Sequence, residues 1–336
     1  MTQARSPFRR SARAGFTLVE LLTVMTVIAI LAAILLPAIN AVMNTVRQST
    51  LLTEIDQLAL AMEEYKNQYG EYPPTLLEVQ TGANVNTATD FSSPEASLNE
   101  ERLRRHISRA FPRFIASDFK IYPKGNKELD LRSLDPAETL VFFLGGMPIN
   151  AGPTKSVEGF SADLSDPFIG SNANHSNAPS GDRPQRTTPL FDFASSRMTD
   201  VDGDGFWEYC PEGMDGVPYV YFRGGQYTYG TDTNAARQPA FYKRANNNFA
   251  VPYSHFVVGG NNRKPPTEVQ KDNWVNPDSF QIICCGKDLR YGVDKDRGRV
   301  YPGFLTDHME PDYDNYANFA TSQLGDNTNV TQDISR

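Results

Sequence analysis

An apolar run of 21 residues near the N-terminus constrains this chain more than any other feature. The run covers residues 16–36 and contains a single charged side chain, that of Glu20. As a helix it would be about 32 Å long, at about 1.5 Å per residue, which is enough to cross the hydrocarbon core of a bilayer. A charge within such a helix costs on the order of 2.5–3.5 kcal/mol. We therefore treat Glu20 as a functional residue and expect a partner for its charge.

A basic leader precedes the apolar run and contains no acidic residue. Its charged residues are Arg5, Arg9, Arg10 and Arg13. A short basic segment before an apolar run is typical of a targeting segment whose N-terminus stays in the cytoplasm. An ordinary secretory signal is cleaved after its apolar part, whereas here the small residue Gly15 precedes that part. The run is also long enough to stay in the membrane.

The junction Gly15-Phe-Thr-Leu-Val-Glu20, with the run that follows, resembles the class III signal of type IV prepilins and type II secretion pseudopilins. The resemblance implies that prepilin peptidase cleaves between Gly15 and Phe16 and methylates the new N-terminus at Phe16. Glu20 then becomes the fifth residue of the mature chain. Pro37 falls where members of this family commonly carry a helix-bending proline. The alternative is a plain signal anchor with an incidental glutamate.

Beyond Pro37, apolar residues recur at spacings of three and four, which predicts one apolar stripe on a continuing helix. The stripe consists of Leu51, Ile55, Leu58, Met62, Tyr65 and Tyr69. Gly70 and the pair Pro73-Pro74 predict the end of the helix. The first half of the helix is apolar on all sides and the second half is amphipathic, so the second half is expected to pack against a globular part.

These signals predict three segments and an α+β fold. The segments are a cleaved leader over residues 1–15, a long helix over residues 16–70 that spans the membrane over about residues 16–38, and a globular head over residues 71–336. Glycine and proline together number 47, so the head is expected to be rich in loops, with short strands in an antiparallel β-sheet.

Four elements of the head are predicted from local patterns. They are a helix over residues 98–111, a helix over residues 136–144 capped by Asp135, a hairpin over residues 218–229 with a turn at Gly224-Gly225, and a strand over residues 279–284. The basic residues between Arg102 and Arg109, with His106, are expected to form a solvated face. Residues 150–189 are expected to form loops.

The formal net charge is −8, and loss of the four leader arginines makes it −12 in the mature chain. A nucleic-acid partner would need a concentrated basic surface, so this class of function is excluded. Such a charge suits a soluble part that does not adhere to anionic lipid.

An acidic loop over residues 200–208 is the clearest candidate for a metal site. Calcium takes six to eight oxygen ligands, and an EF-type loop supplies them from positions 1, 3, 5, 7 and 9 with glycine at position 6. The residues that match these positions are Asp200, Asp202, Asp204, Phe206 through its carbonyl, Glu208, and Gly205 at position 6. Position 12 is Pro211 instead of glutamate, and no clear helices flank the loop. We therefore predict a single calcium loop, with a solvated acidic turn as the alternative.

A second candidate calcium loop follows the strand predicted over residues 279–284. It resembles the C-terminal calcium loop of major pseudopilins, and the resemblance implies ligands at Asp288, Asp312 and Asp314. The alternative is a surface loop whose carboxylates face water. Calcium is dilute in the cytoplasm, so bound calcium would stiffen the head only after export.

Signals for catalysis are weak. The histidines, His106, His175, His255 and His308, are isolated in the sequence, and no nucleophile elbow, phosphate loop or zinc pairing occurs. Cys210, Cys284 and Cys285 either include a disulfide between Cys210 and one of the adjacent pair or are buried apolar residues on strands. We expect no enzyme, unless distant ionisable groups converge in one pocket.

The function expected is that of a structural subunit in a pilin-like filament, with a head that becomes periplasmic or extracellular. The chain would lie in the inner membrane with one span and its N-terminus in the cytoplasm. Expected partners are prepilin peptidase, other pilin or pseudopilin subunits, the inner-membrane assembly platform and the lipid bilayer. The alternative is an anchored adhesion module that binds a surface or polysaccharide through a platform of Tyr219, Tyr221, Tyr227 and Tyr229.

Overall fold

The computed structural model describes residues 16–79, 93–114, 119–123, 128–151, 154–169, 185–229, 238–244, 248–254, 274–292, 299–301 and 314–324. The leader with Gly15 lies outside these residues, as do His175, His255, His308 and Asp312. Contacts divide the chain into two compact units, Met1–Thr50 and Leu51–Arg336. The division falls inside the first helix, whereas the segments predicted from the sequence divide where that helix ends.

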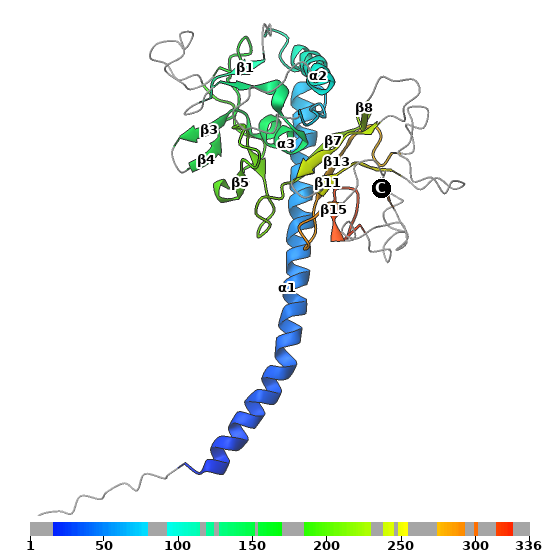
Figure 1. Ribbon diagram of the computed structural model, residues 1–336. Coiled ribbons are helices and arrows are strands. Elements are labelled where there is room, and N and C mark those ends of the chain that lie inside the picture. Colours follow the sequence, from blue (N-terminus) through cyan, green and yellow to red (C-terminus); the bar gives the residue numbers. More distant parts are fainter. Residues whose placement is uncertain are drawn as a thin grey trace, which may run out of the picture. The chain divides into compact units, whose positions relative to one another are not determined.

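Helix α1 (Leu18–Tyr69) is continuous over 52 residues (Figure 1). Its first part is long and apolar enough to cross a membrane by length and composition, and its apolar side chains are exposed. The hydroxyls of Thr23 and Thr26 donate to the carbonyl oxygens of Glu20 and Leu22 at 3.0 and 2.8 Å. These polar groups are therefore satisfied within the helix, as a hydrocarbon environment requires. Pro37 lies in the helix interior.

The later part of α1 belongs to the C-terminal unit and carries the predicted stripe. Leu51, Ile55, Leu58, Met62 and Tyr65 are buried, while Leu60 on another face is 70% exposed. The helix ends at Tyr69, and Gly70 follows with a φ of +86°, a conformation that favours glycine. The predicted stripe and the predicted helix end are both confirmed.

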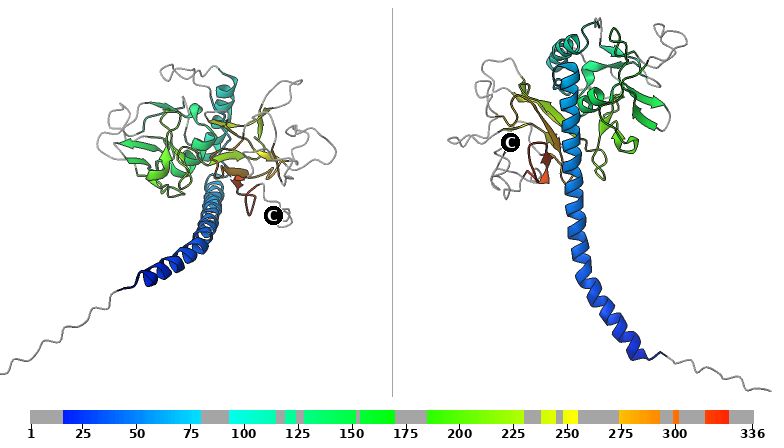
Figure 2. Two further views of the ribbon diagram at one scale, coloured as in Figure 1. Left: turned by 60° about the horizontal axis from the view of Figure 1, so that its bottom comes forward. Right: turned by 180° about the vertical axis from the view of Figure 1, so that it is seen from behind.

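Helix α2 (Pro94–Ala110) begins four residues before the predicted start at residue 98. Ser93 caps it, accepting a hydrogen bond from the Ala96 amide at 3.1 Å, and Pro94 occupies its first turn. The prediction of a wholly solvated basic face is wrong, because Arg102 and His106 are buried. Arg102 donates to the carbonyl oxygen of Thr75 at 2.5 Å, which satisfies a charge that burial would otherwise make costly. Both views of Figure 2 place α2, in cyan, beside the end of α1.

Helix α3 (Pro136–Gly145) is buried along its whole length. Its N-terminus is a capping box, in which Asp135 accepts from the amides of Ala137 and Glu138 while the Glu138 side chain accepts from the Asp135 amide. The predicted cap at Asp135 is confirmed. Two short 3-10 helices, η1 (Leu131–Ser133) and η2 (Ser195–Arg197), complete the helical elements of the described residues.

The β structure consists of short strands in small sheets. The strands are β1 (Lys120–Ile121), β2 (Leu129–Asp130), β3 (Pro148–Ala151), β4 (Thr154–Val157), β5 (Met198–Thr199), β6 (Glu208–Tyr209), β7 (Val220–Arg223), β8 (Thr228–Tyr229), β9 (Gln238–Pro239), β10 (Tyr242–Arg244), β11 (Asn248–Ala250), β12 (Tyr253–Ser254), β13 (Phe280–Cys284), β14 (Arg299–Val300) and β15 (Tyr316–Ala317). The largest sheet has the order β15-β13-β7 and is antiparallel. The pairs are β1-β2, β3-β4, β5-β6, β8-β9 and β10-β11, all antiparallel, and β12-β14, which is parallel. The α+β fold with antiparallel sheets is confirmed.

Two local predictions, one of a hairpin and one of a loop, are wrong. The hairpin over residues 218–229 does not form, because β7 pairs with β13 and β8 pairs with β9. Gly224 instead donates its amide to the carbonyl oxygen of Ser279 at 2.6 Å, which extends the β7-β13 pairing to the glycine that was predicted to turn. Part of the predicted loop over residues 150–189 is the hairpin of β3 and β4, which begins just before it.

The central strands lie between two hydrophobic clusters. Tyr219 and Tyr221 belong to the cluster that contains the α1 stripe, whereas Val220 and Phe222 belong to the other. Ile282 and Ile283 of β13 divide in the same way. Alternate residues of a strand point to opposite faces, so this sheet is covered on both sides. Helix α3 packs against β7 and β6, which brings its N-terminal turn close to the loop between β5 and β6.

Candidate functional site

The N-terminal junction forms a capping box that the sequence analysis missed. The amide and hydroxyl of Thr17 donate to Oε2 of Glu20 at 2.9 and 2.7 Å, and the Glu20 amide lies 3.2 Å from the Thr17 hydroxyl oxygen. Threonine followed three residues later by glutamate is the sequence signature of this motif. The carboxylate is therefore held at the first turn of α1, one turn from Phe16, which is 73% exposed.

The acidic loop over residues 200–207 connects β5 and β6, which pair as a hairpin. Each aspartate folds the loop by accepting a backbone hydrogen bond: Asp200 from Gly203 at 2.8 Å, Asp202 from Asp204 at 3.2 Å, and Asp204 from Phe206 at 2.8 Å. Gly203 has a φ of +80°, which the tight turn requires. The aspartate carboxylates thus hold the loop in its conformation through hydrogen bonds to its own backbone.

The structure brings a residue from α3 to this loop. Carboxylate oxygens of Glu138, Asp202 and Asp204 all lie within 4.8 Å of one another. Oε2 of Glu138 accepts from the Asp135 amide at 3.0 Å, whereas Oε1 is buried and accepts from no N–H or hydroxyl group of the described residues. The sequence identified Asp135 as a helix cap but gave no signal that Glu138 would meet a loop more than 60 residues later. We name these three residues the acidic triad.

The predicted carboxylate ligands Asp200 and Glu208 are not members of the acidic triad. Glu208 is buried, and its oxygens accept from the Val201 amide at 2.8 Å and the Tyr242 hydroxyl at 3.0 Å. The ring of Phe206 is in the core, where it packs against Phe142 with centroids 5.9 Å apart, and the role of its carbonyl oxygen stays a prediction. Of the four predicted carboxylate ligands, the structure gathers Asp202 and Asp204 with Glu138.

Seven carboxyl groups around the loop interact electrostatically, and the pKa of each is raised. The residues are Glu78, Asp135, Glu138, Asp200, Asp202, Asp204 and Glu208. Burial is the main cause in every case, because it disfavours the charged form. Asp202 is exposed, but desolvation of its carboxyl by the surrounding protein and the neighbouring charge of Asp204 raise its pKa to about 7, and burial raises the pKa of Glu208 to about 8. Near neutral pH several of these carboxyl groups therefore retain a proton, and a bound cation would favour their ionised forms.

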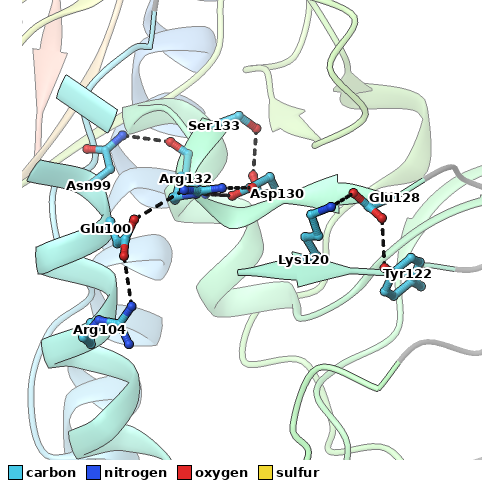
Figure 3. Close-up of polar contacts among 9 residues, drawn as sticks. All are labelled: Asn99, Glu100, Arg104, Lys120, Tyr122, Glu128, Asp130, Arg132 and Ser133. Carbon is cyan, nitrogen blue, oxygen red and sulfur yellow. Dashed lines mark hydrogen bonds and ion pairs between the residues drawn. The ribbon is translucent and has the colours of Figure 1, made fainter. Parts of the chain in front are cut away.

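The loop is anchored to the rest of the fold through Ser133. Its hydroxyl oxygen lies 2.8 Å from Oδ2 of Asp204 and 2.9 Å from the carbonyl oxygen of Asp130. Figure 3 shows the network behind it, in which Arg132 pairs with Asp130 at 2.6 Å and with Glu100 of α2 at 3.3 Å. This network fixes η1 and thereby the position of Asp204.

The second predicted calcium loop is brought together in part. The Asp288 amide donates to Oδ2 of Asp314 at 3.1 Å, and Gly286 contacts the Asp314 carboxyl so closely that a Cβ atom would not fit. Burial and the charge of Asp314 raise the pKa of Asp288 to about 6. Asp312 lies outside the described residues, so its predicted role stays a prediction.

The tyrosine platform is not present at the surface. Tyr219, Tyr221 and Tyr227 are at most 2% exposed, so they fill the core and offer no stacking surface for a glycan. The side chain of Tyr229 lies outside the described residues.

All three cysteines are buried free thiols, and burial raises the pKa of Cys210 to about 12. The sequence left two alternatives, a disulfide or buried apolar cysteines, and this structure has buried free thiols.

Comparison with known proteins identifies the N-terminal segment. Residues 10–36 match the family model of the prokaryotic N-terminal methylation motif. No curated protein and no solved structure matches the chain. The matched segment contains Gly15, Phe16 and Glu20, so it confirms the resemblance carried by the junction. The chain carries the prepilin signal of the type IV pilin and pseudopilin family at its N-terminus.

Proposed function

We propose that the protein is a structural subunit of a pilin-like filament, held in the inner membrane by the first part of α1 until it is assembled. The observation that carries the proposal is the match of residues 10–36 to the methylation motif, together with a long apolar helix whose first turn holds Glu20. The motif points to a structural protein rather than an enzyme. The head would face the periplasm or the cell exterior.

The proposed assembly step pairs two charges that are each costly in lipid. Cleavage after Gly15 frees an α-amine at Phe16 that is positive at neutral pH even when methylated. The Glu20 carboxylate of an incoming subunit neutralises the amine of its neighbour in the filament. Apolar residues of the same segment then leave lipid and pack against identical helices by close contact. The capping box holds Glu20 at the helix N-terminus, where the helix dipole also favours its negative charge.

Within this family, three features bear on the system and on the type of subunit. The approach of Asp288 and Asp314 supports a subunit of a type II secretion pseudopilus, because the resemblance to major pseudopilins was carried by that loop. The large head, with 266 residues after residue 70, favours a minor or lineage-specific subunit. Large tip pseudopilins usually lack the glutamate at the fifth mature position, so Glu20 argues against that role.

Processing is tested by the intact mass and N-terminal sequence of the protein isolated from membranes. We expect a chain that begins with N-methylated Phe16. A chain that still begins at Met1, or one that begins well beyond Leu36, contradicts the proposal because the paired amine would not exist.

Assembly is tested with Glu20→Ala in the full chain. We expect normal membrane insertion and cleavage but loss of incorporation into filaments, because the incoming subunit cannot neutralise its neighbour's amine. The matched control is Asp56→Ala, which removes an exposed carboxylate from the same helix outside the apolar run and should assemble normally. Normal filaments from Glu20→Ala would refute the pairing.

A further inference from the structure

We propose that Glu138, Asp202 and Asp204 bind one calcium ion, which joins the N-terminal turn of α3 to the loop between β5 and β6. This ligand set differs from the one that the loop motif predicts, because it replaces Asp200 and Glu208 with a residue from α3. The inference does not depend on filament assembly, and it concerns only the C-terminal unit.

The geometry of the acidic triad fits a shared ion. Calcium lies about 2.3–2.6 Å from its oxygen ligands, so two oxygens on the same ion are separated by at most about 5 Å. The ligand oxygens of the three residues lie within 4.8 Å of one another, which satisfies this limit for every pair. Asp202 is the exposed member, Asp204 is half-buried and Glu138 is buried, so the ion would sit at the inner end of the loop with access from solvent.

The unpartnered oxygen of Glu138 is the second observation that points to a ligand. Glu138 is 1% exposed, and among the described residues no N–H or hydroxyl group donates to its buried Oε1. The carboxyl of Glu138 lies within hydrogen-bonding reach of that of Asp204, so without a metal the two groups share a proton. A buried polar atom without a partner destabilises a fold, and more so when it is charged. The capping box holds Oε2 on the Asp135 amide, so the side chain cannot turn away from the aspartates. A cation bound to Oε1 and Asp204 would take the place of a shared proton.

The donor set selects a hard cation. All three ligands are carboxylates, and within the described residues no histidine or cysteine belongs to the group. Each carboxylate has about four acceptor positions, so the hydrogen bonds that Asp204 accepts from Phe206 and Ser133 leave positions for a metal. Calcium takes six to eight oxygens in flexible geometry and accepts bidentate carboxylates and water, whereas magnesium demands a stricter octahedron.

The test uses the full chain in detergent, stripped of metal and then titrated with calcium by calorimetry and by thermal unfolding. We expect calcium at about 100 times its dissociation constant to raise the Tm by about 5 °C, from the linkage of binding to stability in a unit of this size. Magnesium at the same concentration should have a smaller effect.

Glu138→Gln is the decisive variant, because glutamine keeps the capping box but removes the charge. We expect calcium affinity at this site to fall at least about 10-fold, which is the low end for losing even an indirect ligand contact. Without calcium, the Tm should equal or exceed that of the wild type, since a buried carboxylate near Asp204 has been neutralised. Asp204→Asn, as a second variant, should also lose the calcium response.

Two control variants separate this site from others. Asp288→Asn alters the second acidic loop, and Asp163→Asn removes an exposed carboxylate that likewise caps a turn, by accepting from the amide of Ser165. Both should keep the calcium response of the acidic triad. The proposal is overturned if Glu138→Gln binds calcium as the wild type does, if Asp288→Asn alone abolishes binding, or if calcium changes neither heat nor Tm in the wild type.

Discussion

At the scale of single residues, Glu71 organises a buried polar network just after α1. Its Oε1 lies 2.9 Å from Nδ1 of His106, and its Oε2 accepts from Arg109 at 2.8 Å and Arg223 at 3.1 Å. Burial would raise the pKa of Glu71, but these hydrogen bonds and the charge of Arg223 outweigh it and lower the pKa to about 2. One carboxylate thus connects α2 with β7.

His106 completes the network in its neutral form. Burial lowers its pKa, and the attraction of Glu71 only partly opposes this. The neutral ring donates from Nδ1 to Glu71 and accepts at Nε2 from the Tyr65 hydroxyl, 2.9 Å away. A histidine that the sequence placed on a solvated face is therefore a core residue that links α2 to the α1 stripe.

Replacing Glu71 with glutamine should destabilise the fold by about 2–3 kcal/mol at pH 7, because two arginines and a histidine lose a charged acceptor. The folded pKa of about 2 lies below the ordinary value of 4.5 for glutamate, so this contribution is present above pH 4.5 and is lost as the pH falls towards 2. Urea unfolding at several pH values should show the difference between wild type and variant shrinking over that window. Glu101→Gln, in an exposed pair with Arg105, should change little.

At the scale of elements, α1 combines two environments in one helix. Its first part exposes apolar side chains on all faces, and its later part buries one stripe in the C-terminal unit. Helix propensity continues through both parts, so the change in environment comes from the spacing of apolar residues and not from a break in the helix. Packing, rather than propensity, supplies most of the stability of the later part.

The stripe can be tested with two leucines two positions apart. Leu58 is fully buried and Leu60 is 70% exposed. Leu58→Ala should lower the free energy of unfolding of the C-terminal unit by about 2–5 kcal/mol, through lost burial and a cavity. Leu60→Ala should lower it by only a few tenths of the loss caused by Leu58→Ala. Chemical unfolding of the two variants in detergent provides the measurement. Equal losses from both would mean that this face of α1 is not packed as described.

Elements defined by local chemistry were predicted well, and those defined by distant pairing were not. The cap at Asp135 and the end of α1 at Gly70 depend on residues a few positions apart, which the sequence displays. The strand at residues 280–284 was recognised from its apolar residues, but its partner was not. The glycine pair beside β7 predicted a hairpin because local turn chemistry was the only evidence available from the sequence. In the structure β7 pairs with the distant strand β13 instead.

At the scale of the whole molecule, the described part of the C-terminal unit has two hydrophobic clusters with the β7-β13 sheet between them. Cys284 and Cys285 are neighbours in sequence, yet Cys284 belongs to one cluster and Cys285 to the other. Cys210 is buried as well. Exposure of all three thiols therefore requires loss of packing on both sides of the sheet.

Thiol labelling should report that loss as a cooperative event. In native conditions we expect no label on Cys210, Cys284 or Cys285, because a thiol reagent cannot reach side chains that are at most 2% exposed. In denaturant without reductant, mass spectrometry should show three labels on one chain. A chain that takes a single label there would carry a disulfide and would contradict the free thiols of the structure.

The sequence by itself determined the main features of the N-terminal region. The apolar run, the Gly15-Phe16 junction, Glu20 and the stripe from Leu51 to Tyr65 are local or periodic features, and their physical meaning does not depend on distant residues. Only the tertiary structure decided that His106 is buried against Glu71 and that Glu138 meets Asp202 and Asp204. These contacts join segments between 35 and 66 residues apart, and a periodic pattern shows that a face is apolar or acidic without showing which distant segment will cover it.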